Sequence, residues 1–191
     1  LVCSSEFIKK NKIFSLLIVV AIAIISVGIF APIIAPYSPF EGNLSDALQP
    51  PSSEHIFGTD KLGRDVFSRV VYGTRISLTA SLVLVISIFT IGTTLGILSG
   101  YFGGIVDEII MRISDIMISF PGMVLAISLA GIMGSSVDNA VIAIMVVSWT
   151  KYARLSRSLV LKIKETDYIY AAKISGCKTI HIITRHIIPN I

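Results

Sequence analysis

Hydrophobic residues in this chain gather into four long stretches, and the charged residues lie between them. A helix that crosses the hydrocarbon layer needs about 20 mostly apolar residues, and its backbone polar groups must be satisfied within the helix. The pattern therefore predicts transmembrane helices at residues 13–35, 76–100, 116–134 and 139–153. The last stretch is short and has to borrow flanking residues such as Tyr152 and Ala153. The expected fold class is all-α, a polytopic bundle of transmembrane helices.

The composition also indicates a membrane protein. Of the 191 residues 53% are hydrophobic and 15% are charged, and the mean hydropathy is +0.83; a water-soluble core needs less. Lys9, Lys10 and Lys12 precede the first stretch, as they would in a secretory signal. That stretch has about 23 uncharged residues, whereas the apolar region of a signal has roughly 7 to 15. We therefore expect a retained transmembrane helix, ended by Pro32 and Pro36.

Lysine and arginine predict the orientation, because cytoplasmic segments are enriched in both. Residues 1–12 and 154–191 are rich in them, so both flanks are predicted to be cytoplasmic, with the N-terminus inside. Residues 36–75 carry acids and bases in near balance and are predicted to form an extracytoplasmic loop. Residues 101–115 then become a cytoplasmic connection, although their own charges give that placement no support.

The basic C-terminal segment has the pattern of a short helix, a break and a second helix. Residues 167–189 read DYIYAAKISGCKTIHIITRHIIP. Ala171 and Ala172 permit the close approach of another protein, Gly176 can take the positive φ that ends a helix, and Pro189 is tolerated only near a helix start or after a helix end. Two interpretations stay open at this point: an amphipathic helix on the membrane surface, or a knob that docks in the groove of another protein.

This segment resembles the EAA loop of ABC importer permeases, whose pattern is Glu-Ala-Ala, three residues, Gly, and later a hydrophobic-Pro pair. The matching residues are in register, and the sequence departs from the pattern at Tyr170, where the family usually has Glu, so no salt bridge is assigned to that position. The resemblance implies that the loop couples to an ATP-binding subunit by docking in its cleft. It places the coupling residues at Tyr170, Ala171, Ala172, Gly176, Cys177 and Pro189.

Two further stretches resemble the permease subunits of dipeptide, oligopeptide and nickel importers. They are HIFGTDKLGRDVFSRVVYGTRISL at 55–78 and GYFGGIVDEIIMRISDIMISFPGMVLAI at 100–127. The resemblance implies a type I ABC permease fold with its permease domain at about 74–191, cut short at the C-terminus because the family continues with two more helices. It implies a bacterial or archaeal cell membrane and half of a pore for peptides or nickel. The implied partners are a second permease subunit, two ATPase subunits, an extracytoplasmic solute-binding protein and the lipid bilayer.

Glycines and one proline predict local features of the helices. Gly92, Gly96 and Gly100 recur at every fourth residue and form one flat helix face, which permits close helix packing in lipid. Pro121 lies within the third expected span and should kink it, and a kink there suits a gate, although bundles contain many kinks that gate nothing.

Residues near the first connection predict a turn. Gly58-Thr59-Asp60 and Gly63-Arg64-Asp65 read as a turn that leads into a helix, with Asp65 near its N-terminus. We expect this stretch to brace the outer end of the second span and assign it no ligand.

The sequence offers no residues for catalysis, for a cofactor or for a metal. Its motifs match neither hydrolase, metalloprotease nor nucleotide-binding patterns, so the chain is expected not to be an enzyme, and ATP hydrolysis is expected in partner chains. Cys3 and Cys177 are interpreted as free thiols, and no nucleic acid is expected as a partner. Two alternatives to an importer permease remain. One is an ion-driven secondary transporter, which requires charged groups inside the spans, and the other is a membrane anchor with a basic tail.

Overall fold

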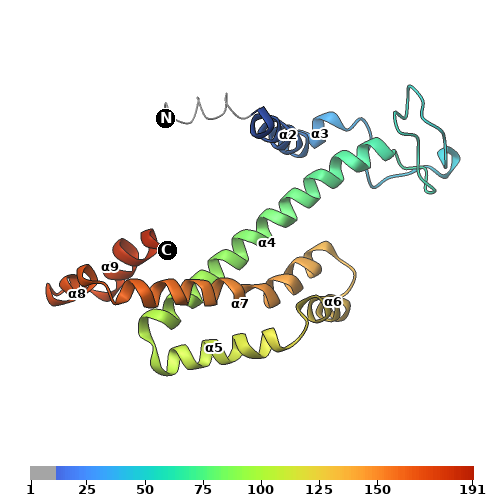
Figure 1. Ribbon diagram of the computed structural model, residues 1–191. Coiled ribbons are helices and arrows are strands. Elements are labelled where there is room, and N and C mark those ends of the chain that lie inside the picture. Colours follow the sequence, from blue (N-terminus) through green and yellow to red (C-terminus); the bar gives the residue numbers. More distant parts are fainter. Residues whose placement is uncertain (1–11) are drawn as a thin grey trace. The chain divides into compact units, whose positions relative to one another are not determined.

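The computed structural model describes residues 12–191. Of the cytoplasmic flank expected at 1–12, all but Lys12 lies outside these described residues, and so does Cys3. The described part is helical and contains no strand, which confirms the all-α prediction (Figure 1). The chain divides into two compact units, Leu1–Ala80 and Ser81–Ile191, and each is described by itself.

The first unit holds two helices in close succession, an irregular loop and the start of a long helix. Its elements are α2 (Lys12–Ile29), α3 (Ala31–Ile34), the 3₁₀ turn η1 (Leu44–Asp46) and the beginning of α4 (Val66–Phe102). Pro32 lies in the first turn of α3, where its missing N–H costs nothing. Gly28 lets α2 approach α4 closely, because a Cβ there would lie 2.6 Å from Leu78 Cδ1.

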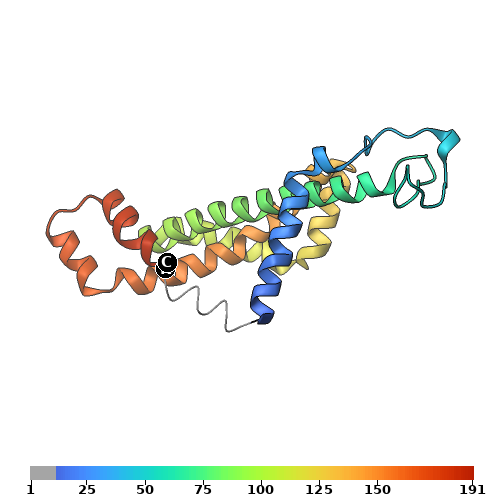
Figure 2. The same ribbon diagram turned by 90° about the horizontal axis from the view of Figure 1, so that it is seen from above.

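The second unit holds the rest of α4 and all later elements. They are α5 (Gly104–Ser119), α6 (Gly122–Met133), α7 (Val137–Lys164), α8 (Asp167–Ile174), α9 (Thr179–Ile182), the π-helical turn η2 (Ile183–Ile187) and the 3₁₀ turn η3 (Ile188–Asn190). In this unit α5 runs alongside α7, and α8 and α9 follow at the C-terminal end of α7 (Figures 1 and 2).

Among the described residues, two helices are long and apolar enough to cross a membrane, α2 and α4. α5 and α6 together would make a third span, bent by 90° between them. α7 contains the fourth expected span but is not among these candidates, and its uncharged part is limited to residues 139–150. Residues 66–75 and 104–115, expected in connections, are helical here. The four span boundaries and their orientation stay predictions.

The glycine face of α4 lies directly against α7. A Cβ on Gly92 would come within 2.6 Å of Trp149 O, one on Gly96 within 2.4 Å of Ala153 O, and one on Gly100 within 2.9 Å of Val160 Cβ. Only a hydrogen atom fits at these positions, so the two backbones approach without intervening side chains. This contact sets how closely α4 and α7 pack.

The turn before α4 is organised by two aspartates. Asp60 accepts hydrogen bonds from the backbone N–H groups of Leu62 (2.8 Å) and Arg64 (3.1 Å) and from Arg64 Nε (2.9 Å), and it also pairs with Arg69. Burial raises the pKa of Asp60, but the hydrogen bonds from Arg64 and Leu62 outweigh burial and hold this pKa well below its ordinary value.

Asp65 caps the N-terminus of α4, which confirms the expected turn into a helix. Its Oδ2 accepts from the backbone N–H of Ser68 at 2.7 Å, and its Oδ1 lies 3.0 Å from His55 Nδ1. Burial raises the pKa of Asp65, yet the hydrogen bonds from Ser68 and His55 prevail and the pKa lies below its ordinary value. The hydroxyl of Ser68 in turn accepts from the backbone N–H of Tyr37 at 3.2 Å, which ties the loop to α4.

Replacing the cap should weaken this turn. We expect Asp65→Ala to cost about 1 to 2 kcal/mol, because it removes an N-cap and the partner of His55. Since the folded pKa is depressed, the contribution of the carboxylate is complete above the unfolded value of about 3.9 and is lost as pH falls from there through the folded pKa. Thermal unfolding of the purified protein in detergent at pH 7 and pH 3 measures both effects. Equal loss of stability by Asp65→Ala at both pH values would contradict this role for the charge.

Candidate functional site

The segment after α7 is anchored by a small buried cluster, to which nearly every element of this end contributes one residue. Ile97 comes from α4 and Val160 from α7, while Ile169, Ile182 and Ile187 come from α8, α9 and η2. All five are buried, and the last three have almost no exposed surface. We call these five residues the anchoring cluster. It holds α8 and α9 to the main helices although both are short.

The turn between α8 and α9 is a Schellman motif. The N–H of Gly176 donates to Lys173 O at 3.0 Å, and the N–H of Cys177 donates to Ala172 O at 3.1 Å. Gly176 has a φ of +76°, the left-handed conformation that such a turn requires and that the sequence predicted. Ala172 and Cys177, which flank the turn, both pack against the anchoring cluster. The glycine is needed for its backbone conformation, since a Cβ there would meet nothing within 4 Å.

The surface of this segment carries large exposed apolar side chains among polar ones. Ile174 at the end of α8 is 88% exposed, Ile180 on α9 is 65% exposed and Tyr170 is 50% exposed. We call these three residues the exposed tip. Large apolar side chains on a segment that also carries Lys173 and Lys178 are unusual for a surface that meets only water, and they are typical of a contact with another protein or with a membrane.

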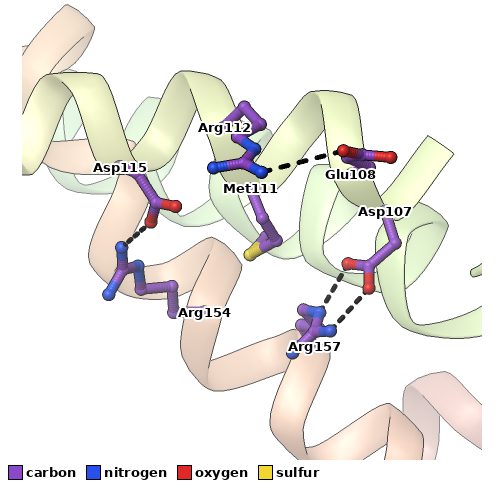
Figure 3. A pocket seen from close by; sticks show the side chains of 7 residues that line it. All are labelled: Asp107, Glu108, Met111, Arg112, Asp115, Arg154 and Arg157. Carbon is purple, nitrogen blue, oxygen red and sulfur yellow. Dashed lines mark hydrogen bonds and ion pairs between the residues drawn. The ribbon is translucent and has the colours of Figure 1, made fainter. Parts of the chain in front are cut away.

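A charged network joins α5 to α7 close to the same end. Arg157 grips the carboxylate of Asp107 with two parallel hydrogen bonds, from Nε to Oδ1 and from Nη2 to Oδ2, both of 2.5 Å. The hydroxyl of Ser99 on α4, fully buried, donates to the same Oδ1 at 2.5 Å. Figure 3 shows this fork at one end of an open groove between the two helices. A two-point contact between guanidinium and carboxylate fixes the distance and the rotation of the helices together.

The groove continues along α5 and holds equal numbers of acids and bases. Arg154 pairs with Asp115 and also donates from Nε to Ser114 Oγ at 3.2 Å, while Arg112 and Glu108 lie 3.8 Å apart on the surface (Figure 3). The hollow has a volume of about 430 Å³, and Met111 completes its lining. The apolar residues Ile105, Ile109 and Ile116 of α5 are exposed. α5 therefore carries both a polar groove face and exposed apolar side chains.

The sequence pattern of a known family covers this whole unit except its first residues. The family is described as "Binding-protein-dependent transport system inner membrane component", and its pattern matches residues 92–191. The chain belongs to this family. A second pattern, the "N-terminal TM domain of oligopeptide transport permease C", matches residues 8–51.

Several relatives of the inner membrane component family are similar to nearly the whole chain. The dipeptide transport system permease protein DppC of Alkalihalophilus pseudofirmus is 45% identical over 183 residues, which cover 96% of this chain and 60% of the relative. DppC of Haemophilus influenzae is 38% identical over 192 residues, 96% and 64% of the two chains. The oligopeptide transport system permease protein OppC of Bacillus subtilis is 36% identical over 182 residues, 95% and 60% of the two chains. The chain thus spans about three fifths of the length of these relatives.

The coupling residues expected from the family resemblance fall into three places. Ala172 and Cys177 are half-buried and, with Gly176, shape the turn, whereas Tyr170 and Ala171 are exposed on α8. Pro189 is exposed in η3, beyond the apolar helical stretch that the sequence predicted. The structure therefore brings the first five to one end of the second unit. Their role in coupling stays a prediction.

Pro121 lies at a sharp break in the helices of this inner membrane component. α5 ends at Ser119, α6 begins at Gly122, and the two are bent by 90°. Phe120 before the proline has an extended conformation, as expected for a residue that precedes proline. Whether the break serves as a gate stays a prediction, as does the coupling role of the other residues.

Sequence reasoning missed the Asp107–Arg157–Ser99 network. The charges of residues 101–115 give no sign of it, because Arg157, the partner of Asp107, lies 50 residues further along the chain. One local signal was present: Ser99 and Asp107 lie on either side of Gly103, the turn between α4 and α5. Among the described residues, no group of three or more His, Cys, Asp or Glu is placed to hold a metal ion.

Proposed function

We propose that this chain is the permease part of an ATP-driven, binding-protein-dependent importer of dipeptides or oligopeptides. The relatives named above are peptide permeases, which favours peptides over nickel, and family membership favours an importer over an ion-driven transporter or a simple membrane anchor. The chain would lie in a bacterial or archaeal cell membrane with its N-terminus in the cytoplasm. It would form half of a pore that a second permease subunit completes, and an extracytoplasmic protein would deliver the solute.

The main support for a coupling role is the exposed tip. Ile174, Ile180 and Tyr170 project from a segment that the anchoring cluster holds firmly, so a partner can bind there and displace the helices behind it. The partner would be an ABC ATPase subunit, one of two in the complex, and ATP hydrolysis would take place there and not in this chain. Closure of the ATPase subunits would push α8 and α9, and the helices would pass the movement to the pore.

Gly176 offers a test of this proposal in the complete transporter. Gly176→Pro cannot take a φ of +76° and loses the N–H that donates to Lys173, so the Schellman turn cannot form. We expect uptake of a radiolabelled dipeptide by cells to fall at least tenfold, while the amount of subunit in the membrane and the ATPase activity of the complex remain. Gly176→Asn is the matched control, because asparagine tolerates the left-handed conformation, and it should keep at least half of the uptake.

Two results would contradict the proposal. One is normal dipeptide uptake by the Gly176→Pro transporter. The other is the absence of ATP-dependent uptake of any peptide of two to five residues by the unaltered transporter, when uptake of nickel or of a single amino acid is present in the same cells.

A further inference from the structure

The ammonium group of Lys173 lies near two tyrosine rings that come from different elements. It is 5.9 Å from the ring centre of Tyr101, at the end of α4, and 5.6 Å from the ring centre of Tyr170, one turn earlier on α8. A cation within about 6 Å of an aromatic ring is attracted by the negative face of the ring. Lys173 thus connects the exposed side of α8 to the junction of α4 and α5.

Tyr101 is itself held firmly. Lys164, the last residue of α7, donates from Nζ to the backbone oxygen of Tyr101 at 2.7 Å, and its ammonium lies 5.8 Å from the same ring. The ring also packs against the anchoring cluster. Six residues further along the chain, Asp107 is gripped by Arg157. The junction that Lys173 reaches is therefore bound to α7 and is the start of α5.

Without this contact α8 would be held only by its connection to α7 and by the anchoring cluster, which Ile169 joins and against which Ala172 packs. Only Glu165 and Thr166 connect it to α7, and Ile169 is its one buried residue. A force on the exposed tip could then be absorbed by bending at Glu165 and Thr166. Lys173 adds an electrostatic contact to these attachments, which joins α8 directly to Tyr101 at the α4–α5 junction.

We propose that Tyr101, Lys173 and Tyr170 form an aromatic clamp that passes movement of α8 to the start of α5. The proposal rests on the proposed function, since it presumes that α8 is moved by an ATPase partner. It also gives Tyr170 a role: the family pattern has Glu at this position, and here an aromatic ring faces Lys173 in place of a carboxylate. The three residues act as positioning residues and contact no solute.

The test separates transport from ATP hydrolysis in the full-length transporter, reconstituted into liposomes with its partner subunits. Lys173→Met removes the charge and keeps the length of the side chain, and Tyr101→Leu removes the ring. We expect each to lower peptide uptake per ATP hydrolysed at least threefold. Lys173→Arg and Tyr101→Phe preserve a cation and a ring face and should stay within twofold of the unaltered protein. Lys162→Met, at an exposed lysine in the last turn of α7, is the control for loss of charge and should also stay within twofold.

A double variant gives the sharpest result. If the two residues act as one device, Tyr101→Leu with Lys173→Met should be no worse than the stronger single variant. The clamp would be overturned if the effects of the two single variants on peptide uptake per ATP multiplied in the double variant. Unchanged uptake per ATP in Lys173→Met would also overturn it. So would a Tyr101→Phe variant as defective as Tyr101→Leu. Because Lys173 is exposed, Lys173→Met should fold normally. The test is therefore decisive even if Tyr101→Leu does not fold.

The clamp and the proposed function fail in different ways. In the same liposomes, a cysteine placed at Ile174 reports whether an ATPase subunit lies against the exposed tip. Cross-linking with normal uptake per ATP in Lys173→Met overturns the clamp alone. Absence of any cross-link to an ATPase subunit overturns the proposed function together with the clamp.

Discussion

Gly96→Leu should prevent the subunit from folding. The Cβ alone would lie 2.4 Å from Ala153 O and 2.7 Å from Ser156 Cβ, so the larger side chain has to push two backbones apart along the glycine face. Overpacking of a well-fitted interior typically costs 1 to 3 kcal/mol, and a clash with backbone lies at or above the upper end, so we expect a loss of about 3 kcal/mol or more. That is a large fraction of the stability of a typical domain, and the amount of folded subunit should fall more than tenfold.

A matched control lies on the same helix. Gly73 is also within α4, but a Cβ there would meet nothing within 4 Å, so Gly73→Leu should leave the folded amount within about twofold. The measurement is the fraction of detergent-solubilised subunit that elutes as a single species, together with its thermal midpoint. Equal behaviour of the Gly96→Leu and Gly73→Leu variants would show that the close approach of α4 and α7 does not determine folding.

Arg157→Gln should produce the second large effect. The variant leaves the carboxylate of Asp107 with only Ser99 as a partner and removes two charge-assisted hydrogen bonds between α5 and α7. Hydrogen bonds to charged groups contribute about 1.5 to 3 kcal/mol. The side chains of Arg157 and Asp107 are 33% and 21% exposed, so we expect about 2 kcal/mol and not the 3 to 5 kcal/mol typical of a fully buried pair.

The control and a rescue are found in the same groove. Arg112 is 75% exposed and 3.8 Å from Glu108, so Arg112→Gln should cost less than about 0.5 kcal/mol. Adding Asp107→Asn to Arg157→Gln removes the isolated carboxylate and should recover part of the loss. Thermal midpoints of the purified complex measure all three. If Arg157→Gln and Arg112→Gln lower the midpoint equally, the fork has no special role in holding α5 to α7.

Features set by neighbouring residues were predictable from the sequence. The helices follow from the long apolar stretches, Asp65 caps α4 as its place before that helix predicted, and Gly176 adopts the left-handed conformation that ends α8. The family, too, was recognisable from three motifs, and the match to residues 92–191 confirms it. Each of these depends on the residue itself and on a few neighbours along the chain.

Features that depend on distant partners were not predictable. The fork between Asp107 and Arg157 and the pair between Asp115 and Arg154 join positions 50 and 39 residues apart, and single-sequence patterns carry no information about such pairing. The placement of Lys173 beside Tyr101 depends likewise on how α8 folds back on the end of α4. The sequence predicted a kink at Pro121 but not its size, because the 90° bend depends on the packing of α6 against α7.

The exposed tip is proposed to lie against an ABC ATPase subunit. Cys177 is a poor reporter of this contact, since it is half-buried and packs against the anchoring cluster, whereas Ile174 is 88% exposed. The decisive measurement is a cross-link from Ile174→Cys, in a Cys3→Ser and Cys177→Ser background, in native membranes of cells that make the full-length subunit. We predict that the attached protein, identified by mass, is a P-loop ATPase and that ATP changes the yield. Attachment to lipid alone, or to no protein although the thiol is accessible from the cytosol, would contradict the account.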